Sequence, residues 1–396
     1  MLRTLILASA CLLAPLSAQQ QTWVIDPNGA GDFLEIADAL PVTGEGWTLL
    51  VKPGDYVLPV IIANQGMTIV ADIPGTVTLS ERVEIKNLGL QRDVILSGLE
   101  LLEGFEATDC NGLVRLQDCV APKPVEDALP PDGVSFDQWA TCGVSSSNQI
   151  VSNCRAVVFV DCLFAGADGL DATSQTFDGY PGDHGLLVED SSVALYGCTL
   201  AGGEGGSAFS SGHFPVVAGA GGDGLRVRGQ SSVAHLTDLL SSGGAGGSWD
   251  PASGNGSFGV TIGCDGSPTA SDVAGVFRTS SHPDLRFTIQ DVARGTTPAT
   301  LSVQGTPGTP VILLSSASAF WRPLPTSIGI LHLRNPLTLT SLGTIPGSGV
   351  LTTSFAHPGP NTTNGMLSYH LQVFGVENGA RFLSEPRRMV VVHPSL

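Results

Sequence analysis

The middle of the chain repeats one pattern three times, in CRAVVFVDCLFAGADG (154–169), SSVALYGCTLAGGEGG (191–206) and SSVAHLTDLLSSGGAGG (231–247). Each copy holds a short β-branched strand, a tight turn, a second short strand and a glycine-rich exit. Cys162 aligns with Cys198, 36 residues later, and Val193 aligns with Val233, 40 residues later. Self-similarity at such a period is typical of a solenoid, in which each coil buries its inward side chains against its neighbours.

The chain before these repeats is also built from short apolar runs, separated by Gly and Asn. An antiparallel sandwich would give a similar set of short strands, and the repeats favour the solenoid. We expect strands at 23–25, 48–52, 60–62, 67–71, 77–79, 83–85, 94–96, 99–102 and 113–116.

The repeats carry extra residues at one place in each coil. Insertions at equivalent points of a repeat protein stack on one face, which is often the binding face. The extra segments are 167–185, 202–224 and 243–259, with a further candidate insertion at 121–141.

These insertions carry a group of acidic and histidine side chains, which is the strongest candidate site. Two close carboxylates can act as acid and base in glycoside hydrolysis, and Asp178, Asp183 and His184 are the catalytic candidates. Carboxylates with backbone carbonyls can instead hold calcium, for which Asp168, Asp171 and Asp223 are the candidate ligands. The competing interpretation is structural, because Asp and Gly suit turns.

Aromatic and imidazole side chains on the same insertions form a candidate saccharide site, since an aromatic ring offers an apolar face with a defined geometry. The competing interpretation is that these rings anchor long loops onto the solenoid. The candidate ligand-binding residues are Tyr180, Phe209, His213, Phe214 and Trp249.

Basic residues are scarce in this part of the chain. Arg226 and Arg228 lie two apart on one expected strand and therefore share a face. We expect them to pair with Glu189 and Asp190 of the preceding coil, and an acidic sugar is the alternative partner.

From about Thr296 the pattern changes to strands in which apolar and polar residues alternate, separated by Gly, Pro or Asn. Six or seven such strands in about 100 residues predict a β-sandwich. We therefore divide the chain into a solenoid with an N-terminal cap at 19–290 and a C-terminal accessory β-sandwich at 296–396.

Residues 1–18 have the layout of a cleaved signal peptide. Arg3 gives a positive start, residues 5–14 are almost all apolar, and Ser17-Ala18 forms a small-residue site. No later stretch reaches about 18 uninterrupted apolar residues, so we expect no transmembrane segment after cleavage. The predicted location is secreted or extracytoplasmic, in the periplasm or at the cell surface.

The composition narrows the class of partner. The formal net charge is −18, which disfavours nucleic acid, because that affinity comes mainly from Lys and Arg on phosphates. The expected partner is a polysaccharide or a component of the cell envelope. Seven cysteines remain after cleavage without a zinc-like spacing, and we interpret most of them as small buried residues or local staples.

The start of the mature chain, GAGDFLEIADAL (29–40) and TLLVKPGDYV (48–57), resembles the opening of pectinesterases and other pectin-lyase-like proteins. The resemblance implies a right-handed parallel β-helix whose end is capped by a short amphipathic helix, here with Asp32 as the expected N-cap. It covers about 35 residues. It implies a function that acts on carbohydrates only by analogy of fold.

The activity is in doubt because the catalytic motifs of these families are missing. The Asn-Thr-Asp and Gly-His-Gly motifs of polygalacturonases and the Gln-Asp-Thr of pectinesterases do not occur. The Arg-Pro-Trp of pectinesterases does not occur either, since Trp321-Arg322-Pro323 has these residue types in another order. The sequence therefore favours a non-catalytic carbohydrate- or envelope-binding module. The alternatives are a polysaccharide lyase or glycoside hydrolase acting through the loop carboxylates, and a structural spacer.

Overall fold

A computed structural model describes residues 20–123, 148–172, 179–208, 216–229, 232–248, 260–261, 269–271, 276–279, 285–324, 330–363, 365–377 and 379–396. In these ranges the regular secondary structure consists of β-strands, apart from one short α-helix, α1 (Ile36–Ala39), and one 3-10 helix, η1 (Leu40–Val42). Within the described ranges, no helix combines the length and apolar composition that crossing a bilayer requires.

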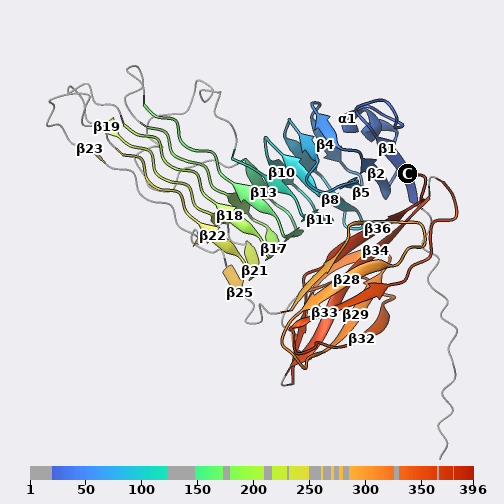
Figure 1. Cartoon of the computed structure of the whole chain (residues 1–396). Coiled ribbons are helices and arrows are strands. Elements are labelled where there is room, and N and C mark those ends of the chain that lie inside the picture. The colour runs from blue at the N-terminus through green and yellow to red at the C-terminus, as the bar shows by residue number, and fades with distance from the viewer. Residues whose placement is uncertain are drawn as a thin grey trace, which may run out of the picture.

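Most of the strands before residue 280 belong to three parallel sheets (Figure 1). Sheet 1 consists of β1 (Gln20–Ile25), β2 (Trp47–Val51), β5 (Met67–Ala71), β8 (Asp93–Ser97), β11 (Leu113–Gln117), β14 (Ala156–Val160), β17 (Ser192–Tyr196), β21 (Val233–Thr237) and β25 (Val276–Thr279). Sheet 2 consists of β3 (Gly54–Tyr56), β6 (Val77–Leu79), β9 (Leu99–Leu101), β12 (Val120–Ala121), β15 (Leu163–Ala165), β18 (Thr199–Ala201) and β22 (Leu240–Ser242).

Sheet 3 consists of β4 (Val60–Ala63), β7 (Val83–Lys86), β10 (Phe105–Thr108), β13 (Gln149–Ser152), β16 (Leu186–Glu189), β20 (Leu225–Arg228) and β24 (Thr269–Ser271). The chain visits sheets 1, 2 and 3 in that order and then begins again, so one pass forms a coil. The expectation of an all-β protein with parallel sheets is confirmed. The predicted strands are present, although β1 begins three residues before the predicted start, and β3, β10, β12 and β13 are additional.

The coils turn sharply after sheet 1 and after sheet 3, and left-handed backbone makes these turns possible. After sheet 1, Asp118, Asp161 and Asp238 have φ values of 51°, 48° and 57°. After sheet 3, Asp109 and Asn153 have φ values of 54° and 52°. Asp and Asn are the non-glycine residues that tolerate this conformation best, which explains their recurrence at the ends of the strands.

The interior of the three sheets is one continuous apolar cluster. The rings of Phe105, Phe159 and Phe164 lie 5.3 to 5.6 Å apart in its centre. The described cysteines are buried free thiols just after the corner residues, as predicted for small core residues, namely Cys110, Cys119, Cys154, Cys162 and Cys198.

The register of the repeats needs one correction. Cys162 and Cys198 are equivalent, because β15 and β18 pair Leu163 with Thr199. Val193 lies opposite Ala234, however, and not opposite Val233. Val193 and Ala234 both point into the core, so the inward positions and not the matching letters set the alignment.

The N-terminal helix is shorter than expected. Its N-cap is Glu35, without a side-chain capping bond. Asp32 instead accepts the backbone N–H of Val24 at 2.8 Å. The helix buries Ile36 and Ala39 against the first coil.

Residues 285–396, the C-terminal unit, consist mainly of antiparallel strands around a second apolar cluster. Its strands are β26 (Arg286–Ile289), β27 (Val292–Arg294), β28 (Ala299–Gln304), β29 (Pro310–Ser316), β30 (Ala319–Pro323), β31 (Ile330–Leu333), β32 (Thr338–Thr344), β33 (Val350–Phe355), β34 (Gly365–Glu377), β35 (Ala380–Leu383) and β36 (Arg387–Val392). β1 pairs with both β2 and β34, so sheet 1 continues into this unit.

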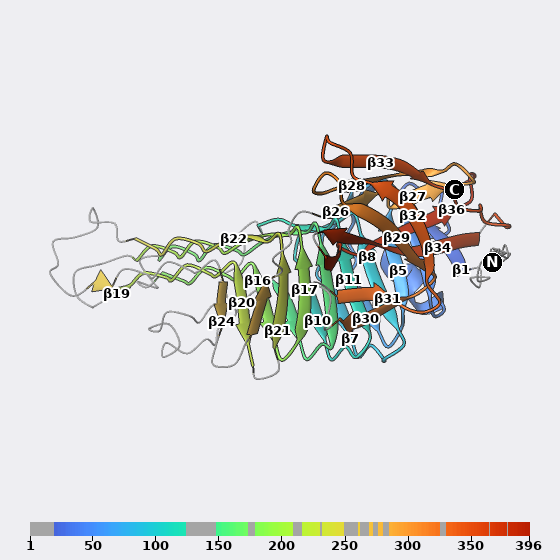
Figure 2. The same cartoon turned by 90° about the horizontal axis from the view of Figure 1, so that it is seen from below.

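The C-terminal unit lies on the outward face of sheet 1 (Figure 2). The central strands of sheet 1 are therefore buried on both faces, and β5, β11 and β14 are each buried at all five positions. Outward residues such as Leu113 and Val158 pack with Ala319 and Ile330 of the unit. The interface also buries charge, because Arg387, only 3% exposed, binds Asp118 at 2.9 Å and also Asp161.

Candidate functional site: a glycine-rich bundle

Five glycine-rich segments connect sheet 2 with sheet 3 in three successive coils. They run side by side, away from the C-terminal unit (Figures 1 and 2). The predicted stacking of the insertions is confirmed for these residues. We call the segments P1 (166–172), P2 (179–185), P3 (202–208), P4 (218–224) and P5 (243–248), and together the glycine-rich bundle.

The hydrogen bonds of the bundle recur every three residues. Gly203 and Gly206 of P3 donate to the carbonyls of Asp183 and Tyr180 in P2, each at 2.8 Å. P4 repeats this relation, with Gly219 and Gly222 donating to Gly206 and Gly203 at 2.8 Å. P5 in turn donates from Gly244 and Gly247 to P4. Three residues per turn is the period of the polyproline II helix, which makes no hydrogen bonds within itself and must find them in neighbours.

Glycine is required here because the backbones approach one another closely. A Cβ on Gly203 or Gly206 would lie well inside 3.0 Å of the carbonyl oxygen of Ala167 or Leu170 in P1. These glycines do not have positive φ values, so their role is space and not backbone conformation.

The glycine content differs between the segments. P1 and P2 read GADGLDA and GYPGDHG, with one glycine in three, whereas P3 and P5 read GGEGGSA and GGAGGS, with two in three. P3 exchanges backbone bonds with P1, P2, P4 and P5. A segment enclosed on several sides needs glycine at each position that faces a neighbour, and only its third position can carry a side chain outward.

Asp168 and Asp171, the calcium candidates on P1, bind main-chain groups of the next coil. Asp168 Oδ1 accepts the backbone N–H of Glu204 at 2.7 Å, and Asp171 Oδ1 accepts that of Ser207 at 2.6 Å. Asp168 also forms an ion pair with Lys123. These carboxylates satisfy the one N–H in three that P3 does not donate to a backbone carbonyl.

His184 plays the same part at the base of the bundle. Its ring is 1% exposed, and Nδ1 accepts the backbone N–H of Asp223 at 2.9 Å. Since Nδ1 is an acceptor, its 3.6 Å contact with the Asp223 carboxylate is not an ion pair. Asp223 instead pairs with Arg226 at 2.8 Å. The structure thus brings a catalytic and a metal candidate together, in a hydrogen-bonded arrangement between coils.

The expected pairing of the two arginines holds for one of them. Arg228 lies 3.6 Å from Glu189 of the preceding coil, and β16 and β20 pair these residues in register. Arg226 pairs within its own coil with Asp223. Its nearest register partner in β16 is Leu187, which offers no charge.

The remaining candidates divide into two groups. Asp183 and Tyr180 contribute main-chain groups to the bundle: Asp183 N–H donates to Ala167, and Tyr180 N–H donates to Leu170. The structure places the Tyr180 ring half-buried at the bundle surface. The other candidates lie outside the described residues, namely Asp178, Phe209, His213, Phe214 and Trp249.

The geometry of the described acids can also be compared with that of a metal site. Among the residues that the structure describes, no three His, Cys, Asp or Glu side chains are grouped so that they could hold a metal ion. Calcium binding by Asp168, Asp171 and Asp223 stays a prediction, and any such site would draw on further ligands.

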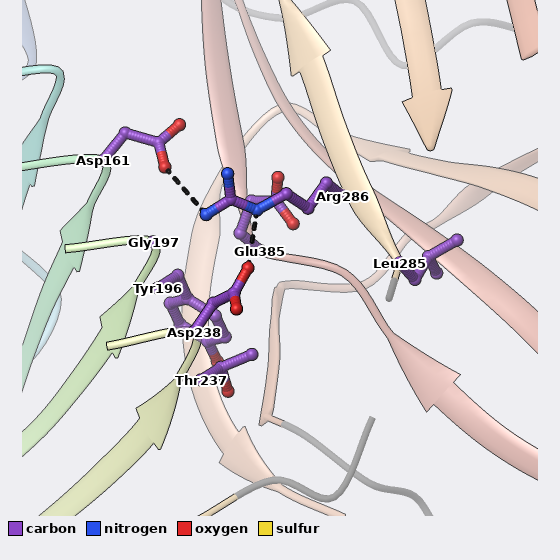
Figure 3. A pocket seen from close by; sticks show the side chains of 8 residues that line it. All are labelled: Asp161, Tyr196, Gly197, Thr237, Asp238, Leu285, Arg286 and Glu385. Atoms are coloured by element: carbon purple, nitrogen blue, oxygen red, sulfur yellow. Dashed lines mark ion pairs between the residues drawn. The ribbon is translucent and has the colours of Figure 1, made fainter. Parts of the chain in front are cut away.

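A second candidate is a corner pocket between the coils and the C-terminal unit (Figure 3). Arg286 crosses it and binds Asp238 at 2.8 Å and Asp161 at 3.9 Å. Its volume is about 10 Å³, roughly what one water molecule needs. The pocket is therefore too small for a sugar ring. Its lining is Asp161, Tyr196, Gly197, Thr237, Asp238, Leu285, Arg286 and Glu385.

Comparison with known proteins adds no family to this description. No protein-family model matches the chain, and no curated protein is similar to it.

Proposed function

We propose that this is a secreted, non-catalytic binding protein that recognises a polysaccharide or a cell-envelope component through its glycine-rich bundle. The observation that supports the proposal is the bundle itself. Five segments from successive coils hydrogen-bond into one projection, which extends away from the C-terminal unit. Binding residues are commonly held on loops that a rigid scaffold positions.

The role of one catalytic candidate also favours binding over catalysis. His184 accepts a main-chain N–H of the next coil. A general acid or base must reach the proton that it transfers, and a side chain that holds the backbone of the next coil is poorly placed for this. The aromatic candidates of the insertions, above all Trp249, are the residues expected to contact a ligand.

The fold that we propose for this scaffold is a right-handed parallel β-helix followed by a β-sandwich. Support for the first comes from the three parallel sheets, which the chain visits in a fixed order. A right-handed crossover is the rule for parallel strands. Support for the second comes from the antiparallel strands around a separate apolar cluster. A solenoid suits the proposed function because its equivalent corners can present insertions side by side.

A polysaccharide and glycan array on the purified secreted protein tests the proposal, once with calcium and once with a chelator. Trp249→Ala is expected to lose retention of the bound glycan. Phe320→Ala is the matched control, because Phe320 is an exposed aromatic residue (41%) of the C-terminal unit, and it should bind as the unaltered protein does.

The same samples are assayed for unsaturated and reducing-end products. Binding without products supports the proposal, and loss of binding in the chelator would assign calcium a part in it. Product formation that Asp183→Ala abolishes would overturn the proposal in favour of a lyase or hydrolase. Failure to bind any glycan or envelope fraction would favour a structural spacer.

A further inference from the structure

The interface between sheet 1 and the C-terminal unit contains an arginine with no hydrogen-bond partner. Arg115 lies in the middle of β11 and points out of sheet 1, between the core residues Val114 and Leu116. Its side chain is among the largest that are fully buried, with 0% exposure. The C-terminal unit covers it.

The neighbouring outward residue shows what Arg115 lacks. Two positions along β11, Gln117 donates from Nε2 to Asp291 and accepts the backbone N–H of Arg388 at 3.0 Å. Among the described residues, Nε, Nη1 and Nη2 of Arg115 have no hydrogen-bond partner. A buried cation without partners is costly, and an acceptor must therefore meet this guanidinium in the folded protein.

The surroundings of Arg115 are rich in cations and imidazoles. Arg115 acts electrostatically on Arg388, His332 and His370, all of which are buried, and each has its pKa lowered first by burial and then by this charge. The Nδ1 atoms of His332 and His370 also have no hydrogen-bond partner among the described residues. Guanidinium and imidazole groups therefore surround Arg115 in this part of the interface.

Carboxylate acceptors are few in the same place. Asp93 attracts Arg115 but does not approach within ion-pair distance of it. Asp291, which attracts Arg388, is engaged by Ser97 and Gln117. Arg387 takes up Asp118 and Asp161.

We propose that a small monovalent inorganic anion, of which chloride is the simplest, binds against the Arg115 guanidinium between sheet 1 and the C-terminal unit. The anion supplies the acceptor that the five N–H groups of a guanidinium require. It is small because Arg115 is enclosed on all sides. It joins the two parts of the molecule, since one side of its site is β11 and the other is the C-terminal unit.

Anomalous scattering from crystals of the full chain grown with bromide tests the site directly. A bromide peak within hydrogen-bond distance of the guanidinium is the expected result. A water molecule, or the Asp93 carboxylate turned onto Arg115, at that position would overturn the proposal. This measurement uses the unaltered protein and does not depend on whether a variant folds.

The solution test is the melting temperature as chloride replaces a larger anion at constant ionic strength. A ligand that binds only the folded state raises this temperature with its concentration. Arg115→Met, which keeps the apolar stem, should lose the chloride-dependent rise. The control Arg228→Met removes an arginine of sheet 3 that is paired near the surface and should keep the rise. An equal rise in both variants would contradict the proposal.

Discussion

The glycine-rich bundle and the interface on sheet 1 bury polar groups in opposite ways. In the bundle, backbone groups of neighbouring segments meet directly, and a few side chains such as Asp168 accept the N–H groups left over. In the interface, long charged side chains pair across the boundary. Arg387 and Arg286 each connect two corners of sheet 1 with the C-terminal unit. Close backbone contact makes a region sensitive to size, whereas buried charge makes it sensitive to charge and pH.

The largest effect of a single substitution should come from a side chain placed between the bundle segments. Gly203→Ala puts a Cβ against the carbonyl of Ala167, and the resulting backbone shift should cost about 3 kcal/mol of bundle stability. Hydrogen exchange of the P1 and P2 amides measures this locally. Glu204→Ala is the control, because the side chain of Glu204 is exposed and its loss should cost below about 0.5 kcal/mol. If the P1 and P2 amides were equally protected from exchange in both variants, the proposed steric role of glycine would be wrong.

A smaller loss is expected when the charged contact of the interface is removed. Arg387→Met leaves Asp118 and Asp161 without their shared partner, which should destabilise the protein by about 2 kcal/mol because the pair is only partly exposed. Arg286→Met is the matched control, since Arg286 also approaches Asp161 but is 42% exposed. It should cost below about 1 kcal/mol. Urea unfolding compares the two, and equal losses would mean that burial of Arg387 is unimportant.

The interface should also respond to pH, because it buries carboxyl groups whose pKa values are raised. Burial raises the pKa of Asp291 and of Glu385 to about 7 each, and that of Asp93 to about 6. A carboxyl with a raised pKa stabilises the folded state fully below its unfolded value near 4, and that contribution is lost as the pH rises through 6 to 7.

We therefore expect the melting temperature to fall between pH 5 and pH 8, by an amount on the order of several kcal/mol, because each pH unit between the unfolded and folded pKa of one carboxyl corresponds to about 1.4 kcal/mol. Asp291→Asn should flatten this slope, because the amide does not ionise. Glu204→Gln, at an exposed position of the bundle, should leave the slope unchanged. A protein that grows more stable across this range would refute the assignment.

The smallest effect concerns the side-chain acceptors of the bundle. Asp168→Ala leaves the N–H of Glu204 without its acceptor and should cost about 1 kcal/mol or less. Asp168→Asn keeps a carbonyl oxygen at that position and should cost less than Asp168→Ala. Melting with and without calcium separates this role from a metal site: a calcium-dependent rise that both variants lose would make Asp168 a ligand.

Much of the coil architecture was predictable, because the strand segments and the cysteine spacing are local signals. Two readable signals were missed. The glycine period in GGEGGS (202–207) indicates a three-residue helix, but it was interpreted as loop composition. The unbroken apolar run of β14 indicates a strand buried on both faces, and thus a cover over sheet 1. The contacts of Asp168 and His184 could not be predicted, since they depend on the register between insertions of unequal length.

The cover on sheet 1 has a consequence for the order of events during synthesis. The outward face of this sheet, with Leu50, Val70 and Val158, is made early in the chain, whereas the strands that cover it come last. Until these strands are made, the nascent protein exposes a long apolar surface, together with charged side chains such as Arg115 that are buried in the folded protein. Exposed surfaces of this kind promote aggregation of folding intermediates. The interval before the C-terminal unit docks is therefore the step at which a chaperone would protect this protein most.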